Sequence, residues 1–214
     1  MALRIDIVSD VMCPWCIVGY KQLERALIDS GTEAEIYWHP FELNPQMGPT
    51  GQNLREHITE KYGSTAEQSE EVRTRLTELG ETLGFDFKFA DDSRIYNTFS
   101  AHQLIHWAGE QGKSHALKQA LFAAYFTDGR DVSQHDVLAD VAAGIGLDRA
   151  EALAVLQDGR FADEVRNKED FWASRGISGV PAMIFDRQHL VTGAQGTDTY
   201  RRFLTQLAGS QAAG

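Results

Sequence analysis

Cysteine is scarce in this chain: its 214 residues contain two, Cys13 and Cys16, and both lie in the stretch SDVMCPWCIVGY. A framework of several structural disulfides is therefore excluded, and a chain of this length can bury a sizeable core without one. In a reducing cytosol, two cysteines this close together are more often catalytic, redox-sensing or metal-binding than structural.

Positive charge is also in short supply, because 20 Lys and Arg face 31 Asp and Glu, for a net charge of -11. This balance disfavours nucleic acid and anionic membranes as partners. No apolar run approaches the roughly 18 residues of a membrane span. The start, MALRIDIVSD, carries acidic residues where a secretory signal needs an uncharged apolar stretch. We therefore expect a cytoplasmic protein without a nucleic-acid or membrane partner.

No Pro/Ser-rich or low-complexity segment marks a linker, so periodicity has to define the architecture. Alternating apolar residues predict a strand over 3–9, a helix follows Cys13 and ends near Gly31, and 34–43 is rich in β-branched and aromatic residues. The middle of the chain has helical period, with FDFKF (85–89) as its one candidate strand. A helix near 160–174, a hairpin (182–185 with 189–194) and a helix over 198–207 follow. The pattern predicts an α/β domain, residues 1–43 and 150–214, split by an all-helical insertion, residues 44–149.

The placement of the cysteine pair indicates its chemistry. Pro14 suits the first position of a helix, which makes Cys13 the N-cap residue. There the helix dipole and unpaired N–H groups would lower the pKa of the Cys13 thiol. Cys16 lies one turn further, on the inward side. We therefore predict that Cys13 is the attacking thiolate and that Cys16 resolves its mixed disulfides.

Three other interpretations of the pair compete. His102 and His106 share a helix face and could complete a zinc site, but the chain has no second cysteine pair, so we expect no metal. The cysteines could instead be buried and inert. They could also belong to a site that only binds and no longer reacts.

Pro181 stands just after Val180 at the start of a predicted strand, a place where the interior of a strand would exclude it. Either it is a trans proline at a strand edge, or the Val180–Pro181 bond is cis and packs against the cysteines.

Together these segments resemble a known family: CPWC (13–16), PFELNP (40–45), NTFSAHQL (97–104), GISGVP (176–181) and GAQ (193–195). The chain resembles the thioredoxin-like fold of the DsbA family, in its FrnE-like branch of cytosolic oxidoreductases. The resemblance implies a thiol–disulfide oxidoreductase in which Pro181 is the cis-proline and the Val180 backbone pairs with substrate. It further implies that the insertion brings Asn97, Thr98 and His102 near the site. The partners would be protein or small-molecule thiols and disulfides, with glutathione or another thiol as co-substrate and no bound cofactor.

The match has departures. Trp15 stands where the periplasmic oxidants have a histidine, and it cannot support a thiolate as a charged imidazole would, so we expect a less oxidising disulfide. Trp172 has no explanation from the sequence. Asp10 is a turn residue, or its charge acts on the cysteines or relays the proton of Cys16. Asp6 either faces solvent or is a buried acid near Cys16.

Two other functions stay open at this point. One is a glutathione-dependent isomerase or transferase of the 2-hydroxychromene-2-carboxylate isomerase or kappa glutathione transferase type, whose members typically lack one or both cysteines. The other is a non-catalytic module that binds unfolded clients.

Overall fold

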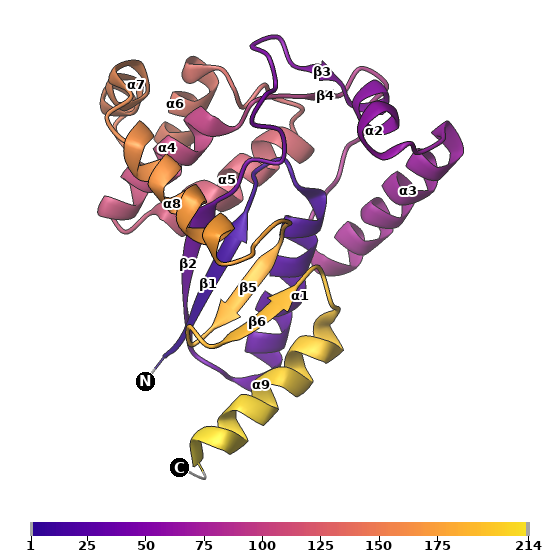
Figure 1. The fold of residues 1–214 in the computed structure, drawn as a ribbon, viewed down its shortest axis with the longest axis vertical. Coiled ribbons are helices and arrows are strands. Elements are labelled where there is room, and N and C mark those ends of the chain that lie inside the picture. Colours follow the sequence, from indigo (N-terminus) through magenta and orange to yellow (C-terminus); the bar gives the residue numbers. More distant parts are fainter. Residues whose placement is uncertain (1, 213–214) are drawn as a thin grey trace.

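The computed structural model describes residues 2–212 and is built around one four-stranded sheet in the order β2-β1-β5-β6 (Figure 1). β1 (Leu3–Ser9) pairs in parallel with β2 (Ala34–Pro40) and antiparallel with β5 (Ala182–Phe185), which continues into β6 (His189–Thr192). All four strands were predicted, although β2 ends at Pro40 rather than at 43 and β6 at Thr192 rather than at 194. The fold is of the predicted α/β class.

The two faces of the sheet are covered by different helices, as Figure 1 shows. Ile5 and Ile7 of β1 join the main core with α1 (Pro14–Ser30) and α9 (Thr197–Ala212), which pack against each other. Val8 belongs to a smaller apolar cluster on the side of α8 (Ala162–Ser174), together with Ile184 of β5. Successive side chains of β1 therefore point into two different cores, one on each face of the sheet, as expected for a strand buried on both faces.

The helix α1 begins and ends where the sequence predicts. Cys13 is its N-cap in an extended conformation (φ -89°, ψ 110°), and Pro14 follows at the first position. Gly31 ends the helix with φ 63°, a left-handed conformation that glycine adopts without strain. This local chemistry fixes both cysteines at the carboxyl end of β1.

A helical segment separates the two parts of the sheet. Its helices are α2 (Leu54–Tyr62), α3 (Ala66–Leu83), α4 (Phe99–Glu110), α5 (Ser114–Phe126), α6 (His135–Gly144) and α7 (Arg149–Asp158). In Figure 1 they gather around the carboxyl end of β1, with α2 and α3 on one side and α4 to α7 on the other. α7 packs against α6 and α4. The division of the chain into two domains stays a prediction.

The expectation of a strand over 85–89 is wrong. Residues 85–89 form no regular element, and Phe85 and Phe87 instead pack edge to face in an aromatic cluster with Phe126. The alternation of aromatic residues reflects this packing rather than strand pairing. A small antiparallel pair of β3 (Gln52–Asn53) and β4 (Arg94–Ile95), which are separated in the chain by α2 and α3, was not predicted, because two-residue strands carry no periodic signal. Across residues 2–212, helices fall short of the length and apolar content that a membrane span requires.

Candidate active site

Cys13 and Cys16 are both present as thiols, and both are buried. Cys13 is 3% exposed, whereas Cys16 is fully covered. The Cys13 sulfur lies 3.7 Å from the carbonyl oxygen of Val180, in the loop that leads into β5. Cys13 is thus the outer residue of the pair and lies against the loop, whereas Cys16 lies deeper in the core.

The prediction that the helix N-terminus lowers the pKa of Cys13 is wrong for this reduced pair. The Cys13 side chain makes no capping hydrogen bond. Its hydrogen bond with Cys16, followed by burial, raises the pKa of Cys13 well above the ordinary value, and the charge of Asp10 adds to this as expected. Burial acts on Cys16 too, but hydrogen bonds with Cys13 and Ser9 and the charge of Lys118 together lower the pKa of Cys16. The two thiols are therefore electrostatically linked and titrate as a pair.

The Val180–Pro181 peptide bond is cis. Pro181 packs directly on α1: a Cβ added to Gly19 would lie 3.2 Å from Cγ of Pro181 and 3.3 Å from Cε of Met183. Real Cβ atoms are rarely this close to other atoms. Gly19 therefore allows the loop to approach the helix that carries the cysteines, and a Cβ at this position would require its neighbours to shift by a few tenths of an ångström.

Asp10 is a buried acid, 1% exposed, rather than a simple turn residue. Its carboxylate accepts hydrogen bonds from the backbone N–H groups of Leu43 (2.7 Å) and Met12 (3.4 Å), and Nε2 of His102 lies 3.6 Å away. Burial alone would raise the pKa of Asp10, but His102, Leu43 and the charge of Lys118 lower it. Asp10 therefore remains a carboxylate, which makes it a weak proton acceptor for Cys16.

Of the residues of the helical segment that were predicted near the site, His102 lies there, whereas Thr98 and Asn97 lie at the start of α4. His102 is 3% exposed, donates from Nε2 to the carbonyl of Phe41 (3.1 Å) and reaches Asp10, so it does join the site. Thr98 is the buried N-cap of α4. Asn97 is turned toward another partner: its amide donates to Glu42 (3.2 Å), and its oxygen accepts from the N–H of Phe99. Asn97 thus organises the start of α4.

Asp6 and Trp172 lie on the α8 side of the sheet. Asp6 is buried, and its carboxylate binds Arg4 (2.7 Å) and Nε2 of His39 (2.7 Å) rather than approaching Cys16. Burial would raise the pKa of Asp6, but these two partners lower it to about 2. The ring of Trp172 packs against the His39 ring at 4.8 Å and covers the cluster that contains Ile184. Trp172 is thus part of this second core.

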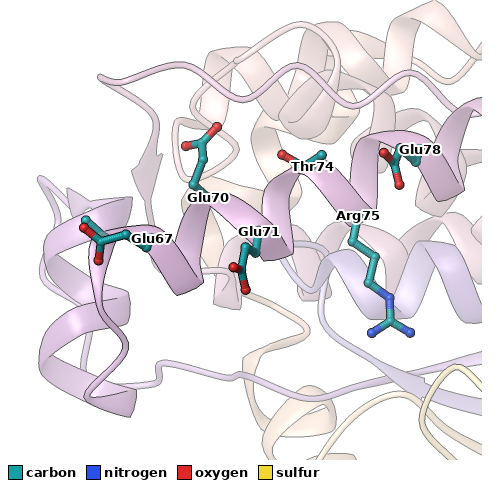
Figure 2. Close-up of a pocket in the computed structure, with 7 residues that line it drawn as sticks. Glu67, Glu70, Glu71, Thr74, Arg75 and Glu78 are labelled. Atoms are coloured by element: carbon teal, nitrogen blue, oxygen red, sulfur yellow. The ribbon is translucent and has the colours of Figure 1, made fainter.

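The exposed face of α3 borders the cysteine motif. A shallow depression of about 610 Å³ lies there, lined mainly by glutamates and by Arg75. Figure 2 shows these side chains along α3. The guanidinium of Arg75 lies 5.7 Å from the ring centroid of Trp15, within the range of a cation–π contact. The glutamates are exposed to solvent. Trp15 is therefore partly covered from α3.

Lys118 is the site residue that the sequence analysis missed. Its side chain is 1% exposed, and its ammonium donates to the carbonyl of Ser9 (3.3 Å), the residue before Asp10. Lys118 follows Leu117 and precedes Leu121 by three positions, so it lies on the apolar stripe of α5. A lysine on such a stripe is a signal that could have been noticed.

The geometry gives no support to a zinc site. His106, the second histidine of the considered set, is bound through Nδ1 to Nζ of Lys168 (3.1 Å) and stacks on Phe161. Within residues 2–212, no three side chains of His, Cys, Asp or Glu are grouped as metal ligands would be.

Comparison with known proteins places this site in a family. A probable DsbA oxidoreductase from Streptomyces coelicolor is 35% identical, with a TM-score of 0.89, and the match covers 97% of this chain and 90% of that one. The uncharacterized protein YwbO of Bacillus subtilis is 26% identical over 210 residues, 96% of this chain and 97% of its own. The cytosolic disulfide reductase DsbM of Pseudomonas aeruginosa, solved with GSH, shares the fold at 19% identity, with a TM-score of 0.66 and coverage of 96% and 100%. The family model described as the DSBA-like thioredoxin domain matches residues 4–205, and the chain belongs to this family.

Proposed function

We propose that the protein is a thiol–disulfide oxidoreductase in which Cys13 attacks the substrate and Cys16 resolves the mixed disulfide. The observation that carries this proposal is the arrangement of the two thiols in depth. Cys13 lies 3.7 Å from the Val180 carbonyl, and Cys16 lies fully covered one helical turn further. Membership of a family of disulfide oxidoreductases supports the same activity. The role of Cys13 rests on its place against the Val180 loop, with Cys16 fully covered behind it.

The reaction can be written as two exchanges. In the first, the Cys13 thiol loses its proton to solvent, and the Cys13 thiolate attacks one sulfur of the substrate disulfide. The substrate S–S bond breaks, one substrate thiolate leaves, and Cys13 holds the other half as a mixed disulfide. Cys16 then gives its proton to solvent or to the departing thiolate and attacks the Cys13 sulfur. The substrate gains two electrons and two protons, and the protein gains a Cys13–Cys16 disulfide.

The proposed partners are proteins or small molecules with thiols and disulfides, and no bound cofactor is required. Glutathione is a reasonable co-substrate, since the structurally similar DsbM was solved with it. We propose that an extended substrate pairs with the Val180 backbone beside Pro181, while Pro14 and Trp15 flank the reacting sulfur. We also propose a cytoplasmic location, as the sequence predicts and as the structurally similar DsbM is described.

A pair of matched serine variants tests the roles. Incubation of Cys16→Ser with oxidised glutathione should trap one glutathione on Cys13, because no resolving thiol remains, and intact mass reports the adduct. Cys13→Ser should form no adduct on the same timescale, because Cys16 is covered. The opposite result would reverse the assignment. Titration of the wild type in glutathione buffers then gives the reduction potential; a value near the roughly -270 mV of thioredoxin would indicate a reductase.

The same variants distinguish the other functions. A glutathione-dependent isomerase or transferase would keep its activity in Cys16→Ala, because it needs only one group to hold the glutathione sulfur. A client-binding module would keep binding unfolded protein after both cysteines are replaced. The proposed oxidoreductase loses turnover in each of these variants.

A further inference from the structure

Three aromatic rings meet where α5 packs on β2. They belong to Tyr20 of α1, Trp38 of β2 and His115 in the first turn of α5. The Tyr20 and Trp38 ring centroids are 5.3 Å apart. The His115 ring lies 5.2 Å from the Tyr20 ring and stacks on the Trp38 ring at 6.0 Å. Tyr20 and Trp38 are buried and His115 is half-buried. A titratable imidazole therefore lies in the contact between α5 and the part of the chain that carries the cysteines.

The indole of Trp38 determines which nitrogen of His115 carries the proton. An indole N–H can only donate a hydrogen bond, and Nε1 of Trp38 lies 3.1 Å from Nδ1 of His115. Nδ1 must therefore accept this bond, which it can do only without a proton. The other nitrogen, Nε2, lies 3.2 Å from the Tyr20 hydroxyl. The imidazole is therefore neutral in this arrangement, with its proton on Nε2.

The hydrogen bonds continue from His115 to the surface of α1. The Tyr20 oxygen accepts from Nε2 of His115, and the Tyr20 hydroxyl donates to the Glu24 carboxylate at 2.9 Å. Glu24 also accepts from the ammonium of Lys21 at 2.8 Å. From the indole to the carboxylate, each donor thus has an acceptor and the bonds all run in one direction. The imidazole of His115 links β2 to α1 through α5.

We propose that the chain of hydrogen bonds from Trp38 through His115 to Glu24 is a pH-sensitive lock that holds the start of α5 on β2 and α1. The lock is closed while His115 is neutral. A proton taken up at Nδ1 would point at the N–H of Trp38, so that two donors would face each other and their bond would be lost. Opening would free the start of the helix that also carries Lys118 to the site. The lock depends on no step of the proposed disulfide exchange.

The surroundings of His115 set the direction of its titration. Burial lowers the pKa of His115, the Lys21 ammonium adds to this, and the Glu24 carboxylate opposes it. Within residues 2–212 the charges that act on His115 are these two of α1, and β2, α4 and α6, which also pack on α5, contribute none. Because the fold favours the neutral form, stability should fall once the pH drops below about 6.5, where histidine in the unfolded chain takes up a proton and folded His115 does not. The lock is therefore closed near neutral pH and opens in acid.

Nuclear magnetic resonance of the imidazole nitrogens tests the tautomer directly. In the reduced wild type at pH 7.5, the signals of His115, assigned by their loss in His115→Gln, should show an unprotonated Nδ1 and a protonated Nε2. Titration toward acid then gives the midpoint at which Nδ1 takes up its proton. A protonated Nδ1 at pH 7.5 would overturn the lock, and this measurement needs no variant in which the lock is altered.

Two variants that each keep an aromatic ring separate the lock from a general loosening. Trp38→Phe removes the donor, so Nδ1 can take up a proton without losing a bond, and the midpoint should rise by about one pH unit, the worth of one hydrogen bond. Tyr20→Phe removes an oxygen that accepts from Nε2 in both protonation states, and more strongly in the charged one, so the midpoint should stay or fall. An equal rise in both variants, or no rise in Trp38→Phe, would refute the inference.

The release of α5 is measured by amide hydrogen exchange, corrected for its intrinsic dependence on pH. The first hydrogen-bonded turn of α5, which begins with the N–H of Leu117, should exchange faster below the His115 midpoint than above it. Urea midpoints should fall over the same range. His115→Gln should lose this part of the pH dependence, whereas His189→Gln, which replaces an exposed histidine, should retain it. Exchange in α5 that does not change across the titration of His115 would show that the hydrogen bonds are present but do not lock the helix.

Discussion

Replacing Gly19 by alanine tests how closely the Pro181 loop must pack on α1. Two effects oppose each other. Alanine is favoured over glycine inside a helix by up to about 1 kcal/mol. The new methyl group would, however, lie 3.2 Å from Cγ of Pro181, 3.3 Å from Cε of Met183 and 3.5 Å from the backbone of Ala194. Overpacking of this kind costs about 1–3 kcal/mol.

The identity of the neighbours decides the sign. The end of Met183 can move aside, but the proline ring and the Ala194 backbone cannot do so without shifting their loops. We therefore expect Gly19→Ala to destabilise the reduced protein by about 1 kcal/mol. Gly109→Ala in α4 is the matched control: its nearest neighbour is Cβ of Ser114 at 3.8 Å, an ordinary contact, so it should stabilise by up to about 1 kcal/mol.

Urea unfolding of the two variants, with the thiols kept reduced, measures the difference directly. Exchange of Cys13 with oxidised glutathione should also slow in Gly19→Ala, since a shifted loop moves the Val180 carbonyl from its position 3.7 Å from the sulfur. If Gly19→Ala gains as much stability as Gly109→Ala and exchanges at the wild-type rate, the close approach has no structural or functional role.

Three other outcomes can be checked. Cys13 should be alkylated before Cys16 by limiting iodoacetamide near neutral pH, as mapped by peptide mass, because Cys16 is fully covered; labelling of Cys16 first would mean that pKa outweighs access. Asp6→Asn should lower stability at pH 7 by roughly 1–2 kcal/mol, because the pKa of Asp6 is lowered to about 2 in the folded state. That contribution is present above about pH 4 and disappears as the pH falls toward 2, so urea midpoints of variant and wild type should converge there. Gly80→Ala should cost about 1–3 kcal/mol in urea unfolding, because its methyl group would collide with the carbonyl of Phe85; unchanged stability would mean that this turn yields easily.

The sequence was most informative where local chemistry decides the structure. Pro14 after Cys13 determines where α1 begins, and Gly31 determines where it ends. The strand that precedes them shows its period in Leu3, Ile5 and Ile7. These signals act within a few residues and do not depend on the rest of the chain, so the elements that carry the cysteines could be predicted almost to the residue.

The electrostatics of the site could not be predicted in this way. The helix-dipole argument for Cys13 considered one helix, whereas the ionisation of the pair depends on the hydrogen bond between the sulfurs and on their burial. His102 lies 92 positions from Asp10 along the chain, and only the packing of α4 brings them together. The same holds for Lys118, whose place on an apolar stripe has meaning only once α5 is known to lie against β2.

The site is therefore built from two parts of the chain. The elements of the sheet and α1 supply the reacting sulfurs and the Pro181 loop, while α4 and α5 supply the basic side chains that face them. His102 meets the carboxylate of Asp10, and Lys118 meets the Ser9 carbonyl beside it, so both basic groups act on one short turn. That turn leads directly into Cys13, so the packing of α4 and α5 determines which basic side chains lie beside the segment that carries the thiols.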